Sequence, residues 1–270
     1  MYYENDVGKV YYEVHGAEND DTLFFCHGVT MDHETFLPQV EGLEDRYRLI
    51  LWDLPGHGES YRIDDYRGYC ATAGALAVEL LAHLGVEKAV LVGQSLGSIV
   101  IQHATHMAPE RVGGSVHLGG APLYPPFNRL LSAFNPLMAL SVSLLPERIL
   151  YSSFAKHKAL REDTRNYLRE VSSRAGKKLI IRLSQEMVRD MVQGLPAATE
   201  EPKLICYGDH EVFFLKQIAR SWHERNPGSR LSIISDAHHI ANQDNPEEFN
   251  ELLASFLGKI RSDSAAAIGG

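Results

Sequence analysis

The sequence of 270 residues predicts an α/β fold: a mainly parallel, doubly wound sheet that carries a helical insertion. Short runs rich in β-branched and aromatic residues alternate with longer segments of helical period, which is typical of βαβ units. Residues 122–196 show helical patterns without a strand pattern, and strand-like sequence resumes at Lys203. The alternation therefore predicts a sheet covered on both faces, and the gap predicts extra helices between two of its strands.

The expected strands are short apolar runs that end near Gly, Asp or Pro. In chain order they are residues 9–15, 22–26, 48–53, 89–93, 114–118, 203–207 and 230–235. Between residues 72 and 85, apolar side chains recur at spacings of three and four, which predicts a helix with one face on the sheet. Gly85 supplies a left-handed stop for that helix.

The insertion divides the chain into a core domain, residues 1–121 and 197–261, and a helical cap, residues 122–196. Ligands of open α/β sheets bind beyond the carboxyl ends of the strands. A cap inserted there would cover the site and help to determine which substrates can bind. Its most apolar part, residues 130–146, is interrupted by Ser, Asn and Pro and is expected to be a helix facing a pocket, not a membrane span. Residues 262–270 are small and are expected to be disordered.

Composition excludes several classes of function. Lys and Arg number 26 against 35 Asp and Glu, and this net charge of −9 argues against nucleic acid as a partner. Three cysteines without metal-ligand spacing, and the absence of H-E-x-x-H and phosphate-loop motifs, predict reduced thiols with no metal and no cofactor. No secretory signal follows Met1, so a cytoplasmic protein without stable membrane insertion is expected, as a monomer or homodimer.

A G-x-S-x-G motif spans residues 93–97, between an apolar strand and the helical segment 96–107. The two glycines allow the backbone to turn sharply from strand to helix, which would leave the Ser95 hydroxyl exposed on a strained corner. Ser95 is therefore the expected nucleophile.

A serine hydroxyl is a poor nucleophile at neutral pH, so this hypothesis requires a base and an acid that orients the base. His238 and His239 follow the last expected strand, and either could be the base. Asp209 and Glu211 follow the strand before it, and either could be the acid. The residues alone leave both choices open.

These motifs resemble the α/β-hydrolase fold superfamily, in its serine hydrolase branch with a helical cap, over residues 22–260. The resemblance implies that His239 is the base and favours Glu211 over Asp209 as the acid, because these positions match the family's motifs. A departure is His238, which stands where the family often has Gly.

The resemblance also implies an oxyanion hole at His27, Gly28 and Val29, a segment that we call the oxyanion loop. The backbone N–H groups of Val29 and Leu96 would bind the negative oxygen that forms during acyl transfer. The residues expected to contact the substrate are His27, Gly28, Gln94, Phe134 and Met138.

Two further segments have structural interpretations. The loop of residues 53–60 resembles a family signature, and Asp53 and His57 are expected to hold it by hydrogen bonds. Asp32 and His33 could line the pocket, but a solvated loop is the favoured interpretation.

The predicted function is that of a cofactor-free serine hydrolase that cleaves a small, largely apolar carboxylic ester, lactone or thioester through an acyl-enzyme on Ser95. The same fold leaves open a carbon–carbon bond hydrolase, a perhydrolase or an acyltransferase. A ligand-binding receptor or scaffold with little turnover is the alternative from another class.

Overall fold

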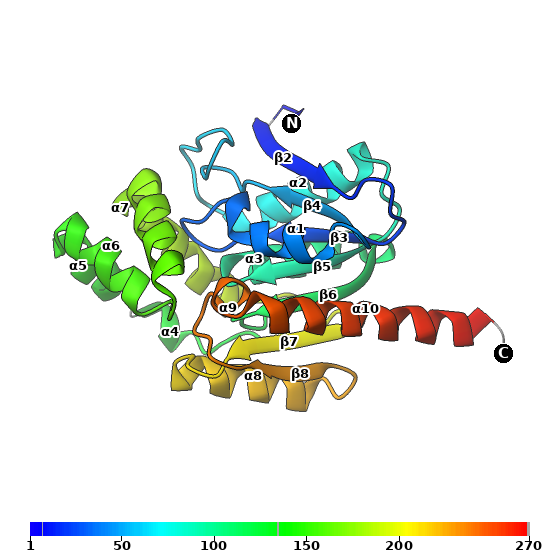
Figure 1. Ribbon diagram of the computed structural model, residues 1–270. Coiled ribbons are helices and arrows are strands. Elements are labelled where there is room, and N and C mark those ends of the chain that lie inside the picture. Colours follow the sequence, from blue (N-terminus) through cyan, green and yellow to red (C-terminus); the bar gives the residue numbers. More distant parts are fainter. Residues whose placement is uncertain (7, 134, 269–270) are drawn as a thin grey trace.

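A mainly parallel sheet forms the centre of the computed structural model, which describes residues 1–6, 8–133 and 135–268 (Figure 1). Within this described chain the strand order is β1-β2-β4-β3-β5-β6-β7-β8. The pairs β1–β2 and β2–β4 are antiparallel and the others are parallel, so the predicted sheet is confirmed. The strands are β1 (Tyr2–Glu4), β2 (Lys9–His15), β3 (Thr22–Cys26), β4 (Arg48–Trp52), β5 (Ala89–Gln94), β6 (Val112–Leu118), β7 (Lys203–Gly208) and β8 (Arg230–Ile234).

Helices cover both faces of this sheet. On β3, Leu23 and Phe25 pack in one core cluster with α1 (Leu37–Leu43) and α10 (Pro246–Ile268). Phe24 and Cys26 point the other way, into a second cluster with α2 (Tyr69–His83) and α3 (Leu96–Met107). Successive strand residues face opposite sides, so a strand covered on both sides is apolar throughout. The sheet is doubly wound, as the alternation of elements predicts. Helix α8 (Phe213–Arg225) packs on β7 and β8.

Short elements join these helices and strands. They are η1 (His33–Phe36), η2 (Pro109–Arg111) and α9 (Ala241–Asp244). Helix α2 ends before Gly85, whose φ of 66° is the left-handed conformation that the sequence predicts there.

Between β6 and β7 the described residues form four helices, which lie beyond one end of the sheet (Figure 1). They are α4 (Leu130–Ala133), α5 (Asn135–Leu144), α6 (Glu147–Lys156) and α7 (Glu162–Gln193), here called the inserted helices. Helix α7 is kinked at Gly176, where φ is 81°. The described helices include none that is both long and apolar enough to cross a bilayer.

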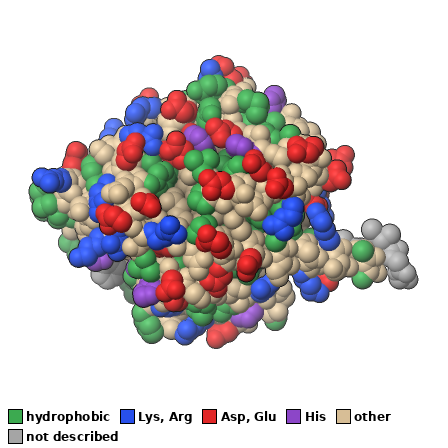
Figure 2. All heavy atoms as spheres, in the orientation of Figure 1, with side chains coloured by type: hydrophobic (Ala, Val, Ile, Leu, Met, Phe, Trp, Pro, Cys, Tyr) green, Lys and Arg blue, Asp and Glu red, His purple; other side chains and the backbone are tan. Residues whose placement is uncertain are grey.

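The apolar residues 130–146 are partly exposed, and Ala139, Leu140 and Ser143 of α5 line an open pocket with residues of α7, as the sequence predicts. Leu130, Leu137 and Leu144 are 70%, 65% and 75% exposed, and hydrophobic side chains reach the surface over α5 at the left edge of Figure 2. Asn135, Ser141 and Ser143 interrupt the apolar run without a regular period, so the sequence alone does not indicate which of its leucines are exposed.

The end of the chain also differs from expectation, because α10 continues to Ile268. Residues 262–268, part of the segment 262–270 that was predicted to be disordered, therefore continue the helix, and residues 269–270 lie outside the described chain. Alanine has the highest helix propensity, and adding residues to an existing helix avoids the cost of nucleation. The prediction of disorder was based on the small surface that these residues can bury, but turns that extend an existing helix do not need to be buried.

Candidate active site

Ser95 occupies a strained corner between β5 and α3. Its φ of 53° and ψ of −110° lie outside the ordinary regions for a residue with a side chain. A Cβ atom at Gly97 would overlap the carbonyl oxygen of Cys26, and one at Gly93 would overlap the backbone of Gly97. The Ser95 N–H donates a hydrogen bond to the Leu118 carbonyl, 2.9 Å away, which ties the corner to β6. The glycines thus let α3 start close against the sheet, as the motif predicts.

His239 and Glu211 form a buried pair at the neighbouring strand ends. The distance from His239 Nδ1 to Glu211 Oε2 is 2.5 Å, and the second carboxylate oxygen accepts the Val212 N–H at 2.8 Å. Burial raises the pKa of Glu211, but the charge and hydrogen bond of His239 have the larger opposite effect and lower the pKa to about 2. Burial lowers the pKa of His239, helped by Lys158 and opposed by Glu211.

These pKa directions define the state of the pair at neutral pH. Glu211 is ionised and His239 is neutral, so Nδ1–H donates to the carboxylate and Nε2 carries a free lone pair. His239 Nε2 is buried and has no hydrogen-bond partner in the described structure. An imidazole held in this tautomer is suited to accept a proton.

The histidine lies beside the serine corner. Gln94, which precedes Ser95, donates from Nε2 to the His239 carbonyl at 3.2 Å. Gly119 lies against the His239 ring: a Cβ atom added at Gly119 would be 2.9 Å from that ring. Gly119 directly follows Leu118, whose carbonyl accepts the Ser95 N–H.

The competing candidates hold the surrounding loop. Asp209 is exposed, and its carboxylate accepts the Ala237 N–H at 3.1 Å. His238 Nδ1 accepts the His239 N–H at 2.8 Å. The structure therefore brings Glu211 to His239, while Asp209 and His238 contact backbone.

The oxyanion loop lies against Ser95. A Cβ atom at Gly28 would be 3.2 Å from Ser95 Cβ and would overlap Gln94 Oε1. Val29 is buried next to it, and Leu96 opens α3, where the first N–H groups have no partner within the helix. Leu96 thus follows Ser95 directly, Val29 follows the glycine that lies against it, and their role as oxyanion donors stays a prediction.

His27 is not available to a substrate, which corrects one expectation. Its ring is fully buried and accepts the Leu54 N–H at Nε2, 3.0 Å away. The proton is therefore on Nδ1, which donates to the Gly28 carbonyl at 2.8 Å. His27 holds β3 to the loop after β4, and burial lowers its pKa to about 4.

The other expected substrate contacts have different outcomes. Gln94 is fully buried, so it links the serine corner to the histidine loop instead of reaching solvent. Phe134 lies outside the described residues, and so does the side chain of Met138.

Sequence reasoning missed residues that join the inserted helices to the site. Asp244 is buried and accepts the N–H groups of Leu160, Arg161 and His238 at 2.9–3.0 Å. The Ile240 N–H donates to the Lys158 carbonyl at 3.0 Å. Asp244 ends the four-residue helix α9, which is too short to show a periodic pattern, so no sequence signal could have identified it.

Met31 was also missed. It is buried beside Gly28 and packs with Ala155, Leu168 and Ile240. Among the described residues, one group could offer metal ligands, namely the exposed Asp209, His210 and Asp236. Exposed acidic groups are common without a metal, and the absence of a metal stays a prediction.

Comparisons with known proteins identify the family of the fold. The family model described as the alpha/beta hydrolase fold matches residues 21–246. A pimeloyl-[acyl-carrier protein] methyl ester esterase of Vibrio vulnificus is 29% identical over 250 residues, covering 88% of this chain and 94% of that protein. A 3-oxoadipate enol-lactonase of Acinetobacter baylyi is 23% identical, covering 92% and 93%. A solved esterase from Thermogutta terrifontis has a TM-score of 0.80 at 21% identity and covers 94% of each chain.

The sheet, the strained serine between β5 and α3, and the match of the family model over most of the chain lead to one assignment. The chain belongs to the α/β-hydrolase fold family.

Proposed function

We propose that this protein is a cofactor-free serine hydrolase that cleaves a small, largely apolar carboxylic ester, lactone or thioester. The observation that carries the proposal is the buried His239 imidazole, which has an ionised Glu211 on Nδ1 and a free lone pair on Nε2, beside the strained Ser95 corner. Relatives named as a methyl ester esterase and an enol-lactonase support ester cleavage.

The proposed reaction has two halves. Nε2 of His239 takes the proton of the Ser95 hydroxyl as Oγ attacks the substrate carbonyl, and the N–H groups of Val29 and Leu96 bind the resulting oxyanion. Glu211 offsets the imidazolium charge. The imidazolium then protonates the departing alcohol, thiol or ring oxygen, which leaves the acyl group on Ser95.

Water completes the cycle. His239 removes a proton from water, the hydroxide attacks the acyl carbonyl, and collapse of the second oxyanion expels Ser95, which recovers its proton from His239. The products are the free acid and the alcohol or thiol released in the first half; a lactone gives a single hydroxy acid, because its ring oxygen stays attached to the acyl group. No redox step occurs, so the residues present account for the whole reaction.

The test is burst release of p-nitrophenol from esters of increasing acyl length, combined with intact-protein mass spectrometry. We expect a burst and a mass increase equal to the acyl group in the parent, and neither in Ser95→Ala. Ser153→Ala, at an exposed serine of α6, is the matched control and should retain both. Activity that survives Ser95→Ala, or a parent that forms no adduct, would overturn the proposal.

A further inference from the structure

Thr30, which follows the oxyanion loop, and Asp32, which follows Met31, have an unusual backbone conformation and an unusual burial, respectively. Thr30 has a φ of 70°, in the left-handed region that β-branched residues rarely adopt. Asp32, two residues further, is 3% exposed although it carries a carboxylate. Strained and buried polar residues persist only where their surroundings fix them, and such strain clusters at functional sites.

Helix α7 supplies the partners of both residues. The Thr30 hydroxyl oxygen is 3.1 Å from that of Ser172. The Tyr167 hydroxyl donates to Asp32 Oδ1 at 2.8 Å and accepts the Asp32 N–H at 3.2 Å. Arg174 donates from Nη2 to Asp32 Oδ2 at 2.8 Å. Residues about 140 positions apart in the chain thus share one hydrogen-bonded cluster, the α7 clamp, formed by Thr30, Asp32, Tyr167, Ser172 and Arg174.

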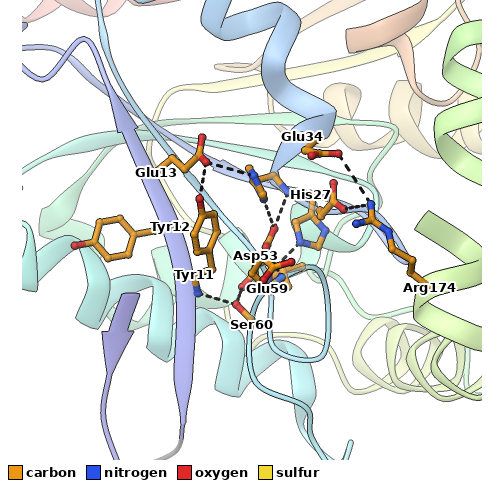
Figure 3. A network of polar contacts seen from close by, with 12 residues as sticks. Tyr11, Tyr12, Glu13, His27, Glu34, Asp53, Glu59, Ser60 and Arg174 are labelled. Atoms are coloured by element: carbon orange, nitrogen blue, oxygen red, sulfur yellow. Dashed lines mark hydrogen bonds and ion pairs between the residues drawn. The ribbon is translucent and has the colours of Figure 1, made fainter. Parts of the chain in front are cut away.

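The next residue is fixed to the core instead. The backbone N–H and Nδ1 of His33 lie 2.7 and 2.8 Å from Asp53 Oδ1, and the Glu59 N–H donates to Asp53 Oδ2 at 2.8 Å. Figure 3 shows Asp53 at the centre of the core network and Arg174 reaching in from α7. The chain is therefore anchored to the core from His33 onward, and the Thr35 N–H donates to the Asp32 carbonyl at 3.2 Å, whereas the side chains of Thr30 and Asp32 are held by α7.

The position of this segment determines where one oxyanion donor lies. Val29 directly precedes Thr30, and Gly28 lies against Ser95. Oxyanion stabilisation requires N–H groups that are placed before the charge develops, and small displacements of a catalytic group cause large losses of rate. A contact that fixes Thr30 and Asp32 would consequently fix the Val29 N–H.

We propose that helix α7 positions the oxyanion loop through Asp32, and that Tyr167 and Arg174 are positioning residues for the reaction. This inference rests on the proposed function, because it requires the Val29 N–H to bind an oxyanion. The inserted helices would then set the rate of the chemical step as well as cover the site.

The first experiment compares Tyr167→Phe and Arg174→Ala with the parent in pre-steady-state acylation. Tyr167→Phe removes only the hydroxyl that touches Asp32. We expect the acylation rate constant to fall about tenfold to a hundredfold, with KM within about twofold of the parent, because the loss acts on the transition state. Arg174→Lys keeps the positive charge and should recover most of the rate. Arg169→Ala removes an α7 arginine that pairs with exposed Glu162, and should match the parent.

A second readout distinguishes positioning from general damage. Butylboronic acid forms a tetrahedral adduct on serine that mimics the oxyanion, whereas butyrate resembles the ground-state product. The affinity of Tyr167→Phe for butylboronic acid should fall in proportion to its acylation rate constant, while its affinity for butyrate stays unchanged. Equal losses for both ligands, or parent-like acylation in Tyr167→Phe and Arg174→Ala, would overturn the positioning role. A parent without a burst would overturn the proposed function and this inference together.

Discussion

The Glu211 carboxylate is buried against the His239 imidazole. The Asp209 carboxylate, two residues earlier, is exposed and accepts a backbone N–H. Glu211→Gln should therefore lower kcat by about three to four orders of magnitude, since the imidazole would lose the partner that fixes its tautomer. Asp209→Asn is the matched control and should change kcat by less than about tenfold. Steady-state kinetics on one p-nitrophenyl ester measures both variants. Equal losses in the two would contradict the assignment.

Residues close together in the sequence were the ones that sequence analysis could assign. The Ser95 motif lies within five residues, and its strand–turn–helix setting is readable from local patterns. Asp32 meets Tyr167 across 135 positions, and neither belongs to a motif. It was interpreted as part of a solvated loop, because nothing in the sequence indicates that a helix of the insertion supplies its partners. Burial of a polar residue is decided by tertiary contacts.

The glycines of the serine corner determine how closely α3 packs on β3. A methyl group at Gly97 would meet the Cys26 carbonyl, which is backbone and cannot move aside, so Gly97→Ala should destabilise the fold by more than about 2 kcal/mol. Gly258→Ala, inside α10 with open space around it, should be neutral or stabilise by up to about 1 kcal/mol. Urea unfolding measures both free energies. A neutral Gly97→Ala would show that the corner tolerates displacement of α3.

Elements with a clear period were predicted within a few residues of their bounds, and the exceptions share a cause. The helical segment 96–107 coincides with α3 because its apolar face repeats regularly. Strand β1 (Tyr2–Glu4) was not expected, since three residues are too short to display a period. The exposure of Leu137 and Leu144 on α5 was not predicted, because a helix with apolar residues on several sides does not show in its sequence which side is exposed. Hydrophobic periodicity in a sequence indicates whether a segment is a helix or a strand more reliably than it indicates which elements that segment packs against.

Buried histidines should make the whole molecule sensitive to acid. Burial lowers the pKa of His27 to about 4 and that of His57 to about 3, and the pKa of His117 and of His239 is lowered in the same way. Below the usual value of 6.5 the unfolded chain then binds more protons than the folded one, so the free energy of unfolding decreases as pH falls from about 6.5 to about 4. His33 opposes this, because Asp53 raises its pKa despite burial.

Urea unfolding between pH 4.5 and 7.5 tests this dependence. His57→Gln should weaken it, because one neutral buried imidazole is removed, whereas substitution of the exposed His210 by Gln should leave it unchanged. A free energy of unfolding that is constant over this range would show that the histidines are solvated, contrary to the burial described above.

Helix α10 ends in a C-terminus that projects from the side of the molecule away from the inserted helices (Figure 1). In its last turns, residues 261–263, 265 and 266 are exposed. A tether to a solid support joined at this end would hold the molecule with the inserted helices and the serine corner directed into the surrounding liquid. Immobilised in that orientation, the enzyme would stay open to dissolved esters.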